Sequence, residues 1–231
     1  MTAPHLIRRA VPQDARAIAA IKQATWPEEN PGAPLDRIAA IIREPDHVVQ
    51  VAEINGALAG FIDSFVTLSA EGVRRWEIDL LAVHPGYRRR GLGRALVAAS
   101  FAAGRNFHPA LARALIRLDN VASQRAFAAN AFTPLPERYR LMIGTPEASE
   151  NTAPPPDAHL IPVQTLNYAG LWIEGQPTTT DCLSARAICA RHGWPVAGAV
   201  IRTHQQAAIR AAKEAGFTAV EDFQWWVRPY R

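Results

Sequence analysis

The sequence lacks the features that mark several large protein classes. Its 231 residues include only two cysteines, too few for a disulfide framework. No run of about eighteen apolar residues could span a membrane, and no apolar signal segment follows Met1. The dinucleotide-binding pattern G-x-G-x-x-G and the P-loop pattern G-x-x-x-x-G-K-[ST] are both missing. We therefore expect a cytoplasmic protein without disulfides or membrane contacts, and without either of these nucleotide sites.

The two cysteines also give no sign of a metal site. Cys182 and Cys189 are seven residues apart, which places them on one face of a helix expected over 181–191. Together with His192 they match no common zinc spacing, and a fourth ligand is lacking. We interpret both cysteines as small core residues and expect no metal.

The net charge of +4 and the isoelectric point near 9.5 raise the question of nucleic-acid binding. A nucleic-acid interface needs a basic face with stacking aromatic side chains. Here the basic residues are dispersed along the chain, and the one dense run is Arg88–Arg90. We expect no nucleic-acid partner and assign this run to an anionic small-molecule cofactor.

The most informative stretch is WEIDLLAVHPGYRRRGLGRALVAAS, residues 76–100. An apolar run of strand length ends at Val83 and is followed by the turn signal His84-Pro85-Gly86. Gly91 and Gly93 then lead directly into good helix formers. The first N–H groups of a helix are unsatisfied and carry the positive end of the helix dipole. This arrangement predicts a site for a diphosphate.

The combination of Val83-His84-Pro85, Tyr87-Arg88 and R-x-x-G-x-G at 88–93 before an apolar helix resembles the signature of the GNAT N-acetyltransferase superfamily. The resemblance covers about residues 4–144. It implies an α/β (α+β) fold, the GNAT acyl-CoA N-acyltransferase fold, with a mixed central sheet flanked by helices. It also implies transfer of the acetyl group of acetyl-CoA to a primary amine of a small molecule or peptide, by direct attack in a ternary complex.

Local patterns predict elements in the order that this family has. We expect strands over 5–10 and 114–118, a strand pair over 47–67 that turns at Asn55-Gly56, and helices over 14–24, 35–43 and 120–131.

The resemblance also implies a cofactor site. The backbone of Leu81, Ala82 and Val83 would pair with the pantetheine arm and the thioester. The loop of Arg88, Arg89, Arg90, Gly91, Leu92, Gly93 and Arg94 would hold the pyrophosphate. Asn120, Ser123 and Phe127 would face the cofactor from the next helix.

For catalysis, Glu77 is the first choice of general base, because it lies six residues before Val83, as does the glutamate of some family members. Asp79 shares its face, since strand side chains alternate. The alternative is that both acids line a solvated strand face. His84 is a weaker candidate for a proton relay. Three residues of the segment between the first two helices are candidates for gripping the amine, with plain loop packing as the alternative: Trp26, Glu28 and Glu29.

Phe127 departs from the family pattern, because many members carry at this position a tyrosine credited with protonating the leaving thiolate. A phenyl ring has no proton to give, although a thiol of pKa about 8.5 leaves tolerably as its anion. This departure keeps open an alternative function, a non-catalytic acyl-CoA-binding or adaptor protein.

The chain is longer than one such domain, and we expect three parts: a GNAT domain over 1–144, a linker over 145–158, and a partial, cofactor-free GNAT-like half-domain over 159–231. Residues 202–218 echo residues 117–133 at a constant offset of 85, which indicates an internal repeat. The second copy of the phosphate loop would fall at 177–182, where the glycines and arginines are missing. We expect the half-domain to pack on residues 1–144 or in a homodimer, with its tryptophans as interface or pocket walls: Trp172, Trp225 and Trp226.

Overall fold

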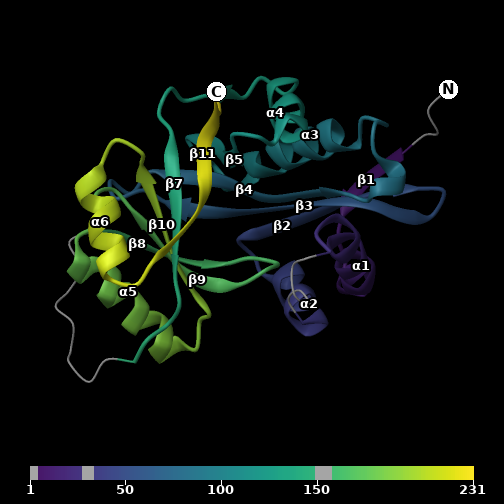
Figure 1. Ribbon diagram of the computed structural model, residues 1–231. Helices are drawn as coiled ribbons and strands as arrows, with labels where there is room; N and C mark the ends of the chain where they lie inside the picture. Colours follow the sequence, from purple (N-terminus) through teal and green to yellow (C-terminus); the bar gives the residue numbers. More distant parts are fainter. Residues whose placement is uncertain (1–4, 28–33, 149–157) are drawn as a thin grey trace.

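The computed structural model describes residues 5–27, 34–148 and 158–231 (Figure 1). Its strands form one mixed sheet in the order β1-β2-β3-β4-β5-β11-β7-β10-β9-β8, and β6 pairs with β11. The strands are β1 (His5–Arg9), β2 (His47–Ile54), β3 (Ala57–Leu68), β4 (Arg74–Val83), β5 (Leu111–Arg117), β6 (Thr133–Pro134), β7 (Tyr139–Gly144), β8 (His159–Gln164), β9 (Ala169–Glu174), β10 (Val196–Arg202) and β11 (Thr218–Pro229). The α-helices of the described residues are α1 (Ala15–Thr25), α2 (Leu35–Arg43), α3 (Leu92–Gly104), α4 (Val121–Ala128), α5 (Thr179–His192) and α6 (Gln206–Glu214).

The predicted elements of the N-terminal part are confirmed, and the mixed α/β fold with them. Helix α2 has the expected bounds, β4 ends at Val83, and the hairpin β2–β3 turns at Asn55-Gly56. Both turn residues have positive φ, 50° and 79°, which is the conformation that a two-residue hairpin turn requires and that Asn and Gly tolerate. The short strands β7 and β8 were not predicted.

Helices cover both faces of the N-terminal sheet (Figure 1). Helices α1 and α2 lie on one face, where Ile18 and Ile38 pack with Phe61 of β3. Helix α3 lies on the other face, where Leu96 packs with Trp76 of β4. Each face is thus closed by an apolar helix stripe, which leaves the ends of the strands to form a site.

The C-terminal part joins the same sheet. Strand β11 lies between β5 and β7 and pairs antiparallel with both, and the other edge of β7 pairs with β10. The C-terminal half therefore packs on residues 1–144 of its own chain, one of the two expected arrangements. A homodimer and the domain boundaries stay predictions. Cys182 and Cys189 are buried in the core under α5, as predicted for small core residues.

The sheet curls so that its C-terminal end returns against β2, β3 and β4. His47 Nε2 lies 2.6 Å from the carbonyl oxygen of Gln164, and the Leu166 N–H donates to Asp63 Oδ2 at 3.1 Å. The rings of Phe65 and Trp172 are 5.7 Å apart. Strands β4, β5, β11, β7, β10 and β9 thereby form an arc with a hollow inside it.

The predicted repeat can be compared with the positions of the strands and helices. Strand β10 begins and ends 85 residues after β5, with the same alternation of buried and exposed residues, and α6 follows it as α4 follows β5. The repeat itself stays a prediction.

Within the described chain, none of the helices combines the length and the apolar character needed to cross a bilayer.

Candidate active site

The site begins where two parallel strands diverge. In the described chain β4 pairs with β5 only from Arg75 to Glu77, whereas β4 runs on to Val83. On its other edge β4 stays paired with β3 up to Val83. The edge of β4 that faces β5 is therefore open along Leu81, Ala82 and Val83, where the sequence placed the pantetheine arm and the thioester.

The loop after β4 presents the start of α3 to an anion. Gly91 is the N-cap of α3, has a left-handed φ of 79°, and makes no side-chain cap. The N–H groups of Leu92, Gly93 and Arg94 lie in the first turn, where a helix offers them no acceptor. A Cβ at Gly91 would meet no atom within 4 Å, and one at Gly93 would lie 3.8 Å from the Ala126 side chain. The backbone is thus bare where a diphosphate would approach, so these residues fit the predicted cofactor.

The loop arginines surround this helix start. Arg88, Arg89, Arg90 and Arg94 are exposed, which leaves their guanidinium groups able to reach a phosphate. Arg88 Nε donates to the carbonyl oxygen of Val83 at 3.3 Å, a contact that fixes the loop to the end of β4.

His84 holds the same turn in shape. Its Nδ1 accepts the N–H of Gly86 at 3.2 Å, which favours a structural role over a proton relay.

Helix α4 forms the far wall of a groove of about 130 Å³. Asn120 caps the helix through Oδ1, which accepts the Ser123 N–H at 3.1 Å. Phe127 is only 3% exposed and packs edge-on against Phe132 with ring centroids 5.0 Å apart. Among the residues that line the groove are these members of the predicted set and its neighbours: Asn120, Ser123, Phe127, Leu81, Trp26 and Asp79. Glu28 and Glu29 lie outside the described residues.

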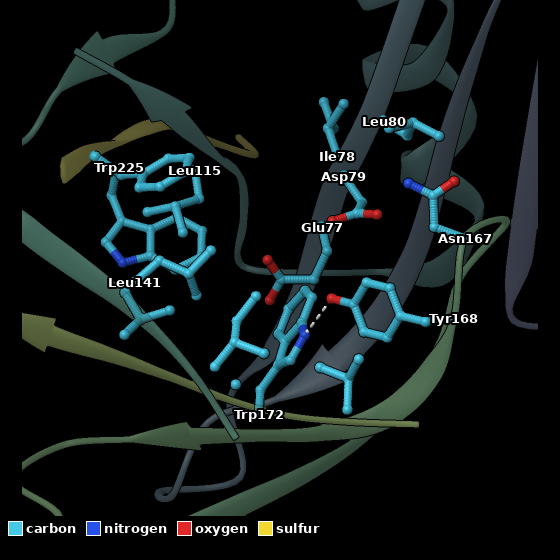
Figure 2. Close-up of a pocket in the computed structure, with 15 residues that line it drawn as sticks. Glu77, Ile78, Asp79, Leu80, Leu115, Leu141, Asn167, Tyr168, Trp172 and Trp225 are labelled. Atoms are coloured by element: carbon cyan, nitrogen blue, oxygen red, sulfur yellow. Dashed lines mark hydrogen bonds between the residues drawn. The ribbon is translucent and has the colours of Figure 1, made fainter. Parts of the chain in front are cut away.

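A second, larger cavity of about 350 Å³ lies inside the arc of strands (Figure 2). Its walls come from six strands and from the turn between β8 and β9. The lining residues are Glu77, Ile78, Asp79, Leu80, Leu115, Leu141, Ile143, Asn167, Tyr168, Trp172, Val196, Gly198, Val200, Phe223 and Trp225. Trp172 and Trp225 are thus pocket walls, whereas Trp226 points to the opposite face of β11 and joins the core under α3.

Asp79 stands where the groove and the cavity meet, since both are lined by Ile78, Asp79, Leu80, Leu115 and Phe223. A bulge between β3 and β4 leaves Asp79 without a paired residue, because Ser64 pairs with Ile78 and Asp63 with Leu80. Burial in this mostly apolar surrounding, together with the charge of Glu77, raises the pKa of the Asp79 carboxyl to about 7. Near neutral pH a large fraction of Asp79 can therefore accept a proton.

A second buried carboxyl, that of Asp63, lies close enough to Asp79 to interact with its charge. Asp63 is fully buried, and its pKa is raised to about 7 by burial first and by Asp79 second. The buried Lys22 lowers the pKa of both carboxyls through its charge. Asp63 does not line the cavity, so the two acids differ in their access to a ligand.

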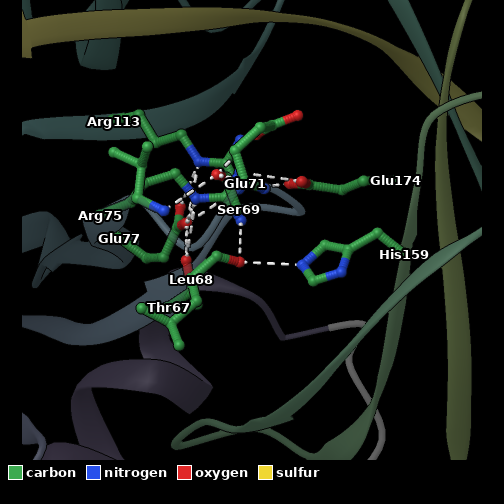
Figure 3. A network of polar contacts seen from close by, with 10 residues as sticks. Thr67, Leu68, Ser69, Glu71, Arg75, Glu77, Arg113, His159 and Glu174 are labelled. Carbon is green, nitrogen blue, oxygen red and sulfur yellow. Dashed lines mark hydrogen bonds and ion pairs between the residues drawn. The ribbon is translucent and has the colours of Figure 1, made fainter.

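Glu77 is held in a buried ionic network (Figure 3). Arg113 Nε donates to both of its carboxylate oxygens, at 2.8 and 2.9 Å, and the Thr67 hydroxyl donates to Oε1. Arg75 and Arg113 both also contact Glu174 of β9, which ties β9 to β4 and β5. With a side chain only 2% exposed and both oxygens occupied, Glu77 is poorly placed to accept a proton from a ligand.

Sequence reasoning missed Asn167 and Tyr168, which lie in the turn between β8 and β9. The Tyr168 hydroxyl accepts the Trp172 Nε1–H at 2.8 Å, and Figure 2 shows the phenol beside Asp79. Burial and Asp79 raise the pKa of this phenol, so it stays protonated. The one signal in the sequence was the spacing of two aromatic residues in NYAGLW, residues 167–172, which gives no indication of contact with β4.

The helix start in the C-terminal half differs from that of α3. Thr178 caps α5 and accepts the Asp181 N–H, while Asp181 accepts the Thr178 N–H at 2.8 Å. Its other oxygen accepts the Ala158 N–H at 3.2 Å. A carboxylate of the chain thus occupies the place of an anion at this helix start. That residues 177–182 bind no cofactor stays a prediction.

An open strand edge, a bare helix start and an adjoining pocket with a carboxyl group are the parts that an acyl-CoA-dependent acyltransferase needs. The family model "Acetyltransferase (GNAT) family" matches residues 15–132, and the chain belongs to that family. Comparison with curated protein sequences gives no significant match.

Solved structures share this fold. A GCN5-related N-acetyltransferase from Sphaerobacter thermophilus has a TM-score of 0.63 at 15% identity, covering 99% of this chain and 97% of the other. The glucosamine N-acetyltransferase region of a fungal multi-domain GH3 β-N-acetylglucosaminidase gives 0.64 at 10% identity, covering 99% and 38%. The protein yncA of Salmonella typhimurium, solved with its cofactor acetyl-CoA, gives 0.52 at 25% identity, covering 58% and 83%. The first two similarities extend over nearly the whole chain, so the C-terminal half belongs to the shared fold.

Proposed function

We propose that this acetyltransferase moves the acetyl group of acetyl-CoA to a primary amine of a small molecule or peptide, by direct attack in a ternary complex. The observation that carries the proposal is the position of Asp79. Its carboxyl stands where the cofactor groove opens into a separate cavity, so that two ligands bound on its two sides would meet there. Binding both at once would convert a bimolecular step into an intramolecular one.

The cofactor would supply an activated acetyl group, as a thioester. Backbone N–H groups of residues 89–94 and the arginines around them would hold the diphosphate. The open edge of β4 at Leu81, Ala82 and Val83 would pair with the pantetheine arm, and α4 would close the groove with Ser123 and Phe127.

Asp79 would serve as the general base. An alkyl ammonium has a pKa of about 10.4 and must lose a proton before its nitrogen can attack. The Asp79 carboxylate would first attract the cation and then accept its proton, directly or through a water molecule. Glu77, the first choice from the sequence, would instead position β4 through its contacts with Arg113. The thiol would leave as its anion, because Phe127 has no proton to give.

The C-terminal half would then have a role without binding cofactor. It supplies Tyr168, Trp172 and Trp225 to the cavity, and its own helix start is closed by Asp181. We propose that residues 1–144 bind acetyl-CoA and that residues 159–231 build the acceptor wall.

The test compares acetyl-CoA binding by calorimetry in the wild type with Gly91→Asp and Gly91→Asn. Asp and Asn are nearly isosteric and tolerate the left-handed φ about equally, so the difference between them isolates the negative charge. Gly91→Asp should lower the affinity at least about tenfold relative to Gly91→Asn, because the carboxylate would face the diphosphate. Equal affinity in the two variants would refute the assigned site.

Transfer is measured separately, as thiol release from acetyl-CoA in the presence of an amine panel. Saturable binding of acetyl-CoA with no amine-dependent thiol release would favour the alternative function, an acyl-CoA-binding protein.

A further inference from the structure

The cavity inside the strand arc has a composition that restricts the acceptor. Apart from Glu77, Asp79, Asn167 and Tyr168, its walls are formed by leucine, isoleucine, valine, glycine and aromatic residues. Asn167 Oδ1 is buried and accepts no hydrogen bond from the described residues, so the wall holds one unpaired neutral acceptor. A volume of about 350 Å³ lies within the range of small-molecule sites, about 300–1,000 Å³. A polar acceptor with many hydroxyl or ammonium groups would leave most of them without partners against these walls.

The charge of the cavity is equally restrictive. Among the described residues that line it, Glu77 and Asp79 are the carboxylates. Glu77 is neutralised by Arg113, whose Nε donates to both of its oxygens. Asp79 is then the one acid available to a cation, and it lies at the mouth toward the cofactor groove.

The far side of the cavity disfavours a second positive charge. The Arg113 guanidinium lies 4.0 Å from the centroid of the Trp225 ring and covers the ring on that side. Arg75 is held beside it by Glu174 at 2.8 Å. A diamine or polyamine that placed one nitrogen at Asp79 would push another toward Trp225. There it would meet apolar side chains, and the nearby carboxylates of Glu77 and Glu174 are already paired with Arg113 and Arg75.

We infer that the acceptor is a primary monoamine carrying a flat apolar or aromatic group, with the nitrogen at Asp79 and the apolar group among Tyr168, Trp172 and Trp225. This inference rests on the proposed function and adds the substrate class. The aromatic side chains come from the C-terminal half of the chain, so this half selects the acceptor.

A substitution at Gly198 of β10 can alter the cavity without altering the cofactor groove, because Gly198 lines only the cavity. It lies in the middle of the strand and lines the cavity. A Cβ at this position would lie 3.9 Å from Trp172 Cδ1 and 4.0 Å from Leu141 Cδ1, which is ordinary contact. An alanine therefore fits, whereas a leucine would project among the aromatic walls and occupy the space of the proposed apolar group.

The experiment measures thiol release from acetyl-CoA with tryptamine, 2-phenylethylamine, spermidine and kanamycin as probes. Tryptamine and 2-phenylethylamine should be the better acceptors by kcat/KM. Gly198→Leu should raise the KM for tryptamine by about tenfold or more, Gly198→Ala by less, since filling a fitted pocket by a few methylenes has effects of this order. Acetyl-CoA affinity, measured by calorimetry, should stay within about twofold in both variants and shows that they are folded.

The outcomes separate the two proposals. Acetylation of spermidine or kanamycin in preference to both aromatic amines would overturn the inference and leave the proposed function standing. An unchanged KM for tryptamine in a folded Gly198→Leu variant would also overturn it. If acetyl-CoA binds and none of the four amines is acetylated, the inference is wrong, and a wider amine panel then decides the proposed function.

Discussion

Replacing Asp79 by Asn tests the proposed chemistry most directly. The amide keeps the size of the side chain and cannot accept the proton, so kcat should fall by about 10²–10⁴, the usual contribution of a general base. The pH profile gives a sharper signature. With a pKa of about 7, about one tenth of the Asp79 carboxyl is ionised at pH 6 and about nine tenths at pH 8.

The assay measures kcat/KM for wild type and Asp79→Asn from pH 5.5 to 9 with one amine. Deprotonation of the free amine, whose pKa is about 10.4, affects both enzymes alike, so the ratio of their rates isolates Asp79. That ratio should rise about tenfold per pH unit below pH 7 and level off above it. The sign follows from the mechanism, because the base acts only when ionised and the raised pKa moves its ionisation toward neutral pH.

Asp63→Asn is the matched control. Asp63 has the same raised pKa and lies behind Asp79, but it does not line the cavity. This variant should keep the rate at pH 8 and the rise of the profile below it. The midpoint should move only toward lower pH, because the charge interaction between Asp63 and Asp79 is lost. If Asp63→Asn abolishes the dependence near pH 7 while Asp79→Asn keeps it, the role given to Asp79 is refuted.

Two further predictions concern stability, each measured by urea unfolding monitored by circular dichroism. Asp63→Asn should stabilise the protein at pH 8 by up to about 4 kcal/mol, because the pKa of the wild-type Asp63 carboxyl rises from 3.8 to about 7 on folding. The gain in unfolding free energy should shrink as the pH falls and vanish below about pH 4. An equal gain at pH 4 would contradict this account. Glu174→Gln should lower the unfolding free energy by about 3 kcal/mol, because it leaves Arg75 and Arg113 partly buried with one carboxylate fewer, whereas Glu71→Gln at the exposed turn should have little effect. Burial raises the pKa of Glu174, but the charges and hydrogen bonds of Arg113 and Arg75 together outweigh burial and lower it. The destabilisation should therefore be full at pH 8 and diminish in acid, where the wild-type carboxyl is itself protonated. Equal stability of wild type and Glu174→Gln at pH 8 would contradict a role for the network.

Local signals predicted most of the fold, because they act over short distances in the chain. The Asn55-Gly56 turn, the apolar run ending at Val83 and the glycines before α3 each specify their element without help from distant residues. The position of β11 between β5 and β7 could not be predicted in this way. It depends on pairing with strands about 75 to 120 residues away, and the sequence of β11 does not indicate which strands these are.

The candidate site also has parts that local sequence predicts and parts that depend on distant residues. The loop residues 88–94 and the open edge of β4 follow from a contiguous motif. Which of Glu77 and Asp79 is free to act as the base depends on Arg113. This arginine is 36 residues from Glu77 in the chain, and its Nε donates to both oxygens of the Glu77 carboxylate. Strand alternation placed both acids on one face, but it gave no information about which of them would be bound by an arginine or which would stand beside a bulge.

The placement of β11 has a consequence for how the chain is made. A ribosome produces β5 and β7 well before Thr218–Pro229, so a nascent chain has both strands with unfilled edges while about a hundred further residues are added after β5. Unpaired edges of this kind invite pairing with other chains. The N-terminal part can complete its sheet only when the final strand reaches it, and folding of the cofactor site thus waits for the strand that also supplies the acceptor wall. A nonsense mutation or a proteolytic cut just before β11 would take away this one strand, yet we expect it to abolish both cofactor binding and acetyl transfer.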